Sequence, residues 1–210
     1  MLIPSRNKIV FTGIPDEFTI NLCNEKLKNY LRSNKFIEGE AYSLDLSEII
    51  IDGIKIYKEE NAFHQNDDNM QKELYKILLP ILKRGYENVL CIGGECYVFS
   101  SIVNAKNIFC YSDSPSIINS CNKNIHKGNM LAELVDYGGF QIPDIKYDLC
   151  ILNVGIKGLG KFLSSYISKL QIREKYYISC NEKSFLQDGF TPINTYTIRN
   201  HLYGIKLYQI

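Results

Sequence analysis

Three strand ends in the second half of the chain carry residues that could contact a nucleoside. Gly93-Gly94, Asp113 and Asn153 each follow directly on an apolar run. The backbone at glycine can approach a ligand closely, and a carboxylate about twenty residues further on is where a ribose is commonly held. An amide at the third strand end is a natural position for a group that contacts the reacting atoms. The order glycine turn, acid, polar strand end is typical of a nucleoside-binding, methyltransferase-type fold.

Each of these residues also has an ordinary structural explanation. Two glycines after a strand often form a tight turn, and Asp113 could cap a helix that begins at Ser114-Pro115. Asn153 could be a turn residue. The sequence leaves these alternatives open, and the order of the three strand ends is what favours a ligand site.

Cys180 is a candidate nucleophile, because a thiolate at a strand end could attack a substrate. A buried strand cysteine is the alternative. Most of the seven cysteines lie in apolar runs, which is typical of buried thiols. No Cys-x-x-Cys pair occurs, so we expect no metal site. This cysteine usage predicts a reduced protein of the cytoplasm.

The elements that must position these residues alternate between strand and helix. Apolar residues recur at helical spacing over 70–81, and Ser114-Pro115 has the residue types of a helix start. We predict an α/β fold, a Rossmann-like class I methyltransferase-type sheet with helices on both faces, at 61–210. Asp52-Gly53 between apolar runs predicts a β-hairpin within a small N-terminal β domain at 1–60. The predicted sheet strands are 89–92, 107–111, 147–152, 176–180 and 204–208, the last as an edge or hairpin strand.

Composition narrows the function classes. The 210 residues are enough for one medium domain with a small appendage, and 45% of them are apolar, which argues against disorder. With 24 basic and 23 acidic residues the net charge is +1, which gives no general electrostatic reason to expect nucleic acid as a partner. No apolar run approaches the ~20 residues that span a bilayer, and the start does not read as a secretory signal. We therefore expect neither a membrane nor a nucleic-acid partner.

From about Phe18 to its end the chain resembles the spermidine synthase family of aminopropyltransferases. The resemblance consists of many short matches in the family's order. The matched segments are 18–22, 33–36, the hairpin at 49–54, Glu59, Phe63, Leu79-Pro80, the glycine turn at 89–94, 110–113, 117–120, 147–153, Ile198 and 204–205.

This resemblance implies transfer of an aminopropyl group from decarboxylated S-adenosylmethionine, as co-substrate, to putrescine. It implies a homodimer that takes small nucleoside and polyamine substrates and needs no metal or further cofactor. Asn153 would stand at the position of the catalytic aspartate. The nucleoside pocket would be lined by Gly93, Gly94, Glu95, Asp113, Ser114 and Asp136.

The departures from the family pattern bear on activity. The glycine turn continues with Glu95-Cys96-Tyr97, whose side chains would crowd a nucleoside, and Tyr111 replaces an acid. An amide at Asn153 cannot accept a proton from an ammonium group, so the base that frees the amine would be missing. A non-catalytic pseudoenzyme that acts as a binding or oligomerisation partner is therefore an alternative.

The chain also resembles the S-adenosylmethionine-dependent RNA uracil-C5 methyltransferases. The segments 60–65, with Met70, and 177–181 are similar to that family's substrate-side segment and nucleophile strand, which implies Cys180 as the attacking thiolate. Asn153-Val154-Gly155 departs from its acid-proline-proline motif, and no glutamate follows His201 as a late base. The sequence favours aminopropyl transfer as the main hypothesis and keeps RNA methylation as the alternative.

Overall fold

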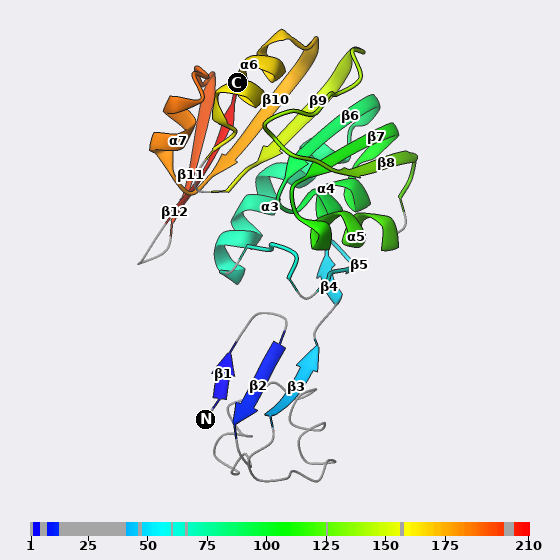
Figure 1. Cartoon of the computed structure of the whole chain (residues 1–210), viewed down its shortest axis with the longest axis vertical. Coiled ribbons are helices and arrows are strands. Elements are labelled where there is room, and N and C mark those ends of the chain that lie inside the picture. Colours follow the sequence, from blue (N-terminus) through cyan, green and yellow to red (C-terminus); the bar gives the residue numbers. More distant parts are fainter. Residues whose placement is uncertain are drawn as a thin grey trace. The chain divides into compact units, whose positions relative to one another are not determined.

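The structure is a computed structural model (Figure 1). It describes residues 2–4, 8–12, 41–45, 48–59, 61–65, 67–124, 126–155, 158–199 and 204–210. The chain divides into two compact units, Met1–Ile49 and Ile50–Ile210.

The first unit contains a small antiparallel sheet. Its strands are β1 (Leu2–Pro4), β2 (Lys8–Thr12) and β3 (Ala41–Asp45), in the order β1-β2-β3. In the strand register, Leu2 of β1 lies opposite Phe11 of β2, and Lys8 of β2 lies opposite Asp45 of β3. The segments 18–22 and 33–36, on which part of the aminopropyltransferase resemblance depends, lie outside the described residues.

The predicted hairpin is confirmed. Strands β4 (Glu48–Ile51) and β5 (Ile54–Tyr57) pair as a two-stranded sheet. The two residues between them both have positive φ, 52° at Asp52 and 75° at Gly53. A two-residue turn with positive φ at both positions matches the twist of the flanking strands, which is why Asp-Gly is so strong a hairpin signal.

The second unit is built on a seven-stranded sheet in the order β11-β12-β10-β9-β6-β7-β8. Strands β10, β9, β6, β7 and β8 are parallel, whereas β12 runs antiparallel to both of its neighbours. The bounds are β6 (Gly85–Gly93), β7 (Asn104–Ser112), β8 (Asn129–Leu134), β9 (Tyr147–Asn153), β10 (Ile172–Ser179), β11 (Asn194–Arg199) and β12 (Gly204–Gln209).

Five described helices connect and cover these strands (Figure 1). The helix predicted over 70–81 extends over α3 (Asp68–Leu82), because the Asp67 side chain accepts a hydrogen bond from the Met70 amide at 2.8 Å and so caps its first turn. The helix predicted after Ser114 is α5, with Pro115 in its first turn. The remaining bounds are α4 (Cys96–Ile102), α5 (Pro115–Lys123), α6 (Gly160–Lys169) and α7 (Glu182–Gln187).

Alternating side chains of the strands build a core on each face of the sheet. One core packs α6 and α7 against strand residues such as Leu90, Leu152 and Tyr177. On the other face α4 contacts β6 and β7, and it also packs against α3 and α5. The predicted α/β sheet with helices on both faces is confirmed, and all carboxyl ends of its parallel strands meet at one edge.

Asp188, just after α7, ties three elements together beneath that edge. Its carboxylate accepts hydrogen bonds from the amides of Leu159 and Gly160, at 2.8 and 3.0 Å, where α6 begins. The Tyr177 hydroxyl of β10 donates to the same carboxylate at 2.7 Å. Burial and the Asp188 hydrogen bond both raise the pKa of Tyr177, so this hydroxyl stays a neutral donor.

We expect Asp188→Ala to lower the free energy of unfolding by about 2–4 kcal/mol, because the buried Leu159 amide and Tyr177 hydroxyl and the partly buried Gly160 amide lose one acceptor. Urea unfolding would measure this. The matched control is Asp136→Ala, since the exposed Asp136 carboxylate accepts only a local turn hydrogen bond from the Gly138 amide, and its loss should cost less than about 1 kcal/mol. Equal losses for the two variants would contradict the role given to Asp188.

Candidate active site

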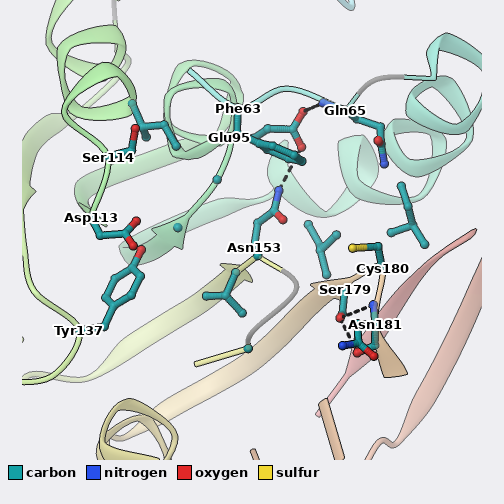
Figure 2. A pocket seen from close by; sticks show the side chains of 18 of the residues that line it. Phe63, Gln65, Glu95, Asp113, Ser114, Tyr137, Asn153, Ser179, Cys180 and Asn181 are labelled. Atoms are coloured by element: carbon teal, nitrogen blue, oxygen red, sulfur yellow. Dashed lines mark hydrogen bonds between the residues drawn. The ribbon is translucent and has the colours of Figure 1, made fainter. Parts of the chain in front are cut away.

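A cavity of about 1060 Å³ opens at the carboxyl edge of the parallel strands (Figure 2). Ligands of open α/β sheets bind at this edge, and the volume accommodates a molecule of nucleoside size or larger. The cavity is lined by Asn61, Phe63, Gln65, Leu74, Gly93, Gly94, Glu95, Asp113, Ser114, Ile117, Tyr137, Asn153, Val154, Gly155, Gly158, Ile178, Ser179, Cys180, Asn181 and Ile205.

The structure brings the three predicted strand ends to this one cavity. Among the residues predicted from the sequence, Gly93, Gly94, Glu95, Asp113, Ser114 and Asn153 all line it. Asp136 does not line it. Its carboxylate instead accepts a hydrogen bond from the Gly138 amide at 2.9 Å, within an exposed turn after β8.

The glycine turn is required by the neighbouring strand as much as by any ligand. Gly93 has a φ of 95°, and a Cβ there would lie 2.2 Å from the carbonyl oxygen of Asn153. The Gly94 amide donates to that same oxygen at 2.5 Å. A Cβ on Gly94 would also lie 2.8 Å from the Phe63 ring. Both glycines therefore let the backbone at the end of β6 lie very close to the end of its parallel neighbour β9.

Glu95 forms a buried carboxylate centre between distant segments (Figure 2). It is only 1% exposed and adopts a left-handed conformation with a φ of 59°. Its Oε1 lies 2.8 Å from His64 Nδ1 and accepts a hydrogen bond from the Gln65 amide at 3.0 Å. Its Oε2 accepts a hydrogen bond from Asn153 Nδ2 at 3.1 Å. The carboxylate thus joins the 61–65 segment to the end of β9.

This arrangement fixes which atom Asn153 presents to the cavity. Asn153 Nδ2 donates to Glu95 Oε2, so the amide nitrogen of Asn153 faces Glu95. The amide oxygen of Asn153 then points away from Glu95, toward the side on which Cys180 lies (Figure 2). The other ring nitrogen of His64, Nε2, contacts the Gln71 side chain, which fixes the orientation of the His64 ring. The cavity wall at Asn153 is therefore an oriented hydrogen-bond acceptor.

The opposite wall suits the nucleoside half of a ligand. Asp113 directly follows β7 and is exposed, and Ser114, the residue before α5, forms no side-chain capping hydrogen bond. Tyr137 lies beside Asp113 in Figure 2, and burial raises the pKa of its hydroxyl, which stays neutral. Ile117 supplies apolar surface next to them. A carboxylate beside aromatic and apolar side chains matches the needs of a ribose and a base.

The predicted crowding of the nucleoside by the side chains after the glycine turn is wrong for Cys96 and Tyr97, and Tyr111 does not fill the cavity either. Tyr97 is fully buried, and its hydroxyl donates to the Phe63 carbonyl oxygen at 3.1 Å. Tyr111 is 1% exposed and belongs to the core against α6. Cys96 is buried too, with its Sγ 3.0 Å from the Gly93 carbonyl oxygen. All three side chains point into packed layers, so they leave the cavity open.

Cys180 differs from the other described cysteines. Its thiol is exposed and faces the cavity, directly after β10 (Figure 2). The expected burial holds for Cys91, Cys96, Cys110, Cys121 and Cys150. Burial raises the pKa of Cys150 and of Cys96, which keeps those thiols protonated and unreactive. Cys180 is therefore the accessible thiol at the site.

Across the described ranges, no cluster of three or more histidine, cysteine, aspartate or glutamate side chains could bind a metal ion. None of the helices described above is long and apolar enough to cross a membrane.

Comparison with known proteins identifies the fold. No protein-family model matches the sequence, and no curated protein matches it significantly. The chain is similar to the tRNA (uracil-54, C5)-methyltransferase of Pyrococcus abyssi, solved with S-adenosyl-L-homocysteine, with a TM-score of 0.63 and 13% identity. The match covers 84% of this chain but 47% of that one, so the chain spans about half of that enzyme's length.

Two other solved structures support the same conclusion. The N-methyltransferase NodS of Bradyrhizobium japonicum matches 69% of this chain and 97% of its own, with a TM-score of 0.54 and 12% identity. Trm5b of Pyrococcus abyssi matches 83% of this chain and 61% of its own, with a TM-score of 0.56 and 16% identity. The predicted class I methyltransferase-type fold is confirmed. The tRNA (uracil-54, C5) enzyme and NodS are methyltransferases by name, and none of the three structures supports the finer assignment to the spermidine synthase family.

Proposed function

We propose that this chain is an S-adenosylmethionine-dependent methyltransferase of the RNA uracil-C5 type, with Cys180 as its nucleophile. The observation that carries the proposal is the exposed Cys180 thiol in the same cavity as the glycine turn and Asp113. A methyl donor and a nucleophile must meet in one site for this chemistry. The fold and the similarity to a tRNA uracil-C5 enzyme support the proposal.

The residues present fit S-adenosylmethionine. The Asp113 carboxylate would accept hydrogen bonds from the ribose hydroxyls, and Ile117 with Tyr137 would contact the adenine. The turn at Gly94 would take the methionine portion, on the side of the cavity nearer to Asn153. When bound, this molecule supplies an electrophilic methyl group.

C5 of the uracil ring is a weak nucleophile on its own. Addition of the Cys180 thiol to the ring would make C5 more nucleophilic. Addition of the Cys180 thiolate to C6 forms a C–S bond and moves the electron pair of the C5–C6 double bond toward C5. C5 would then bond to the methyl carbon of the donor, whose carbon–sulfur bond would break in the same step and release a neutral thioether. Loss of the C5 proton to an acceptor and expulsion of the thiolate from C6 restore the double bond and the enzyme.

Asn153 argues against the aminopropyl reaction. That reaction needs a group that removes a proton from an ammonium nucleophile. The amide nitrogen of Asn153 is already committed as a donor to Glu95, and its oxygen is not basic enough to take the proton. The geometry therefore favours a site that recognises a ring edge over one that deprotonates a diamine.

We expect the chain to form a covalent complex with RNA that contains 5-fluorouracil, provided that S-adenosylmethionine is present. Fluorine at C5 cannot leave as a proton does, so the adduct is trapped after methyl transfer. Denaturing gels and mass spectrometry of the peptide containing Cys180 would detect it. The same RNA with ordinary uracil is the control and should be methylated without trapping.

Three results would contradict this proposal in different ways. Binding of S-adenosylmethionine without adduct or methylation would support the pseudoenzyme. Formation of spermidine from putrescine and decarboxylated S-adenosylmethionine would restore the aminopropyl hypothesis. Failure to bind any S-adenosyl compound in calorimetry would remove the methyl donor from the site.

A further inference from the structure

A second, smaller hollow of about 190 Å³ adjoins Cys180. It shares Ser179, Cys180 and Ile205 with the large cavity, so the two spaces meet at the proposed nucleophile. Its other lining residues come from α7 and from the β11–β12 hairpin. They are Glu182, Thr197, Arg199, Gly204 and Lys206.

The antiparallel end of the sheet gathers polar side chains at this hollow. Lys206 of β12 pairs in register with Ser179 of β10 on one side and with Thr197 of β11 on the other. The next same-face pair along β11 and β12 is Arg199 with Gly204. A Cβ on Gly204 would lie 3.0 Å from Arg199 Cγ, so the glycine leaves room for the arginine stem. Two hydroxyls, an ammonium and a guanidinium therefore share one face of the sheet.

Positive charges outnumber negative ones among the residues that line this hollow. Lys206 Nζ lies 2.6 Å from Glu182 Oε1, in a pair that is partly exposed to solvent. An ammonium has three donors, so this contact leaves others for a second acceptor. Arg199 forms no ion pair with any residue of the described ranges. The hollow thus offers the Arg199 guanidinium, a shared ammonium and the Thr197 hydroxyl as donors, whereas the Ser179 hydroxyl already donates to the Asn181 carbonyl oxygen at 2.9 Å.

A group with several anionic oxygens fits this donor set. Guanidinium and ammonium groups together with hydroxyls are the usual ligands of phosphate. A uracil that reaches Cys180 as part of RNA carries phosphodiesters on both sides, and one of them must lie near the mouth of the cavity.

We propose that this hollow binds the backbone phosphate next to the target uridine, through Arg199 and Lys206. The inference depends on the proposed function, because it assigns to that same site a polynucleotide substrate. It also accounts for RNA binding by a chain whose net charge is only +1, since the cations are concentrated beside the nucleophile. The whole-chain charge, from which we expected no nucleic-acid partner, averages over this local arrangement.

The test compares charge-neutralising variants with matched controls on the opposite edge of the sheet. Arg199→Gln and Lys206→Gln should each weaken binding of a uridine-containing oligoribonucleotide by about five- to tenfold and reduce the slope of log K against log salt by about 1. The controls are Arg173→Gln and Lys106→Gln, which also remove cations. Lys106 forms an ion pair with Glu87, as Lys206 does with Glu182, so the two lysine variants are matched. They should change neither quantity. Fluorescence anisotropy across a salt series measures both.

Glu182→Gln gives a test in the opposite direction. Removing the carboxylate that competes for Lys206 should tighten RNA binding by about two- to fivefold, an outcome that a misfolded variant would not produce. None of these variants should alter the affinity for S-adenosylmethionine, which binds in the large cavity.

The outcomes separate this inference from the proposed function. If wild-type protein forms the 5-fluorouracil adduct while Arg199→Gln and Lys206→Gln bind RNA like wild type, the phosphate site is wrong and the function stands. If RNA binding depends on Arg199 and Lys206 but no adduct forms, the phosphate site is supported and the Cys180 chemistry fails. Equal weakening by the control variants would overturn the phosphate site, because it would show only a general charge effect.

Discussion

Cys180→Ala is expected to abolish methyl transfer and the covalent complex, lowering turnover by at least about a thousandfold. The proposed reaction begins with addition of this sulfur to the substrate ring, and an alanine methyl group cannot form that bond. Cys180 is exposed, so the substitution should change the free energy of unfolding by no more than about 0.5 kcal/mol. Affinity for S-adenosylmethionine should also be unchanged, since Asp113 and the glycine turn are untouched. Single-turnover transfer of a labelled methyl group measures the effect.

The matched control is Cys150→Ala, which removes a buried thiol of β9. It should cost stability and leave the activity of the folded fraction intact. Alkylation of the native protein with iodoacetamide should modify Cys180 and spare Cys150, because burial raises the pKa of that thiol. Retention of the 5-fluorouracil adduct in Cys180→Ala would show that another group is the nucleophile.

Strong local signals in the sequence located the buried elements. Asp52-Gly53 predicted its hairpin because few residue pairs accept positive φ at two successive positions. The apolar run at 147–152 predicted β9, whose side chains are almost all buried. Strands β8 and β11 were missed. Their residues are mostly exposed. The apolar run of β8 is only Met130-Leu131-Ala132, and the alternation in β11 is short, so pairing with a neighbouring strand decides that both are strands.

The position of the strand predicted at 204–208 within the sheet could not be predicted from its own residues. The strand was expected as an edge or hairpin strand, and the structure makes it β12, the second strand of the β11–β12 hairpin, and β12 lies in the sheet between β10 and β11. Its position inside the sheet depends on antiparallel pairing with β10, a strand about thirty residues earlier. No property of its own residues encodes that choice.

The candidate site could be predicted in outline and not in its contacts. Parallel strands must end at one edge, so Gly93, Asp113 and Asn153 had to come together once the fold was right. The direction of Tyr97 and Tyr111 could not be read in the same way, because it depends on which face of α4 and β7 each residue occupies. The Glu95 centre was also hidden, since Glu95 and Asn153 are 58 residues apart and their hydrogen bond exists only in the folded chain.

Glu95→Gln is expected to lower kcat/KM for RNA methylation by about 10- to 100-fold while leaving the fold intact. In the native protein one carboxylate oxygen serves two donors, His64 and the Gln65 amide, and the other oxygen serves Asn153. A glutamine has a single oxygen, which must remain with the two donors. Its NH₂ group then faces Asn153, and two donors cannot share a hydrogen bond.

Asn153 resolves this conflict by rotating its amide through 180°. Its oxygen then accepts from the glutamine, and its NH₂ group points into the cavity where an acceptor stood before. A ring edge that donated to Asn153 now meets a donor, and an unpaired polar group in a largely buried site costs about 1–3 kcal/mol, which is the predicted loss in kcat/KM. The free energy of unfolding should fall by less, because every buried group except the ligand's still has a partner.

The double variant Glu95→Gln with Asn153→Asp should recover most of the lost activity. An aspartate accepts from the glutamine with one oxygen and again presents an oxygen to the cavity. Asn153→Asp alone should be worse than the double variant, because it places two carboxylates at about 3 Å, where one of them must take up a proton. Steady-state kinetics of the four proteins, with urea unfolding of each, measures this cycle. Additive losses in the double variant would show that Glu95 does not act by orienting the Asn153 amide.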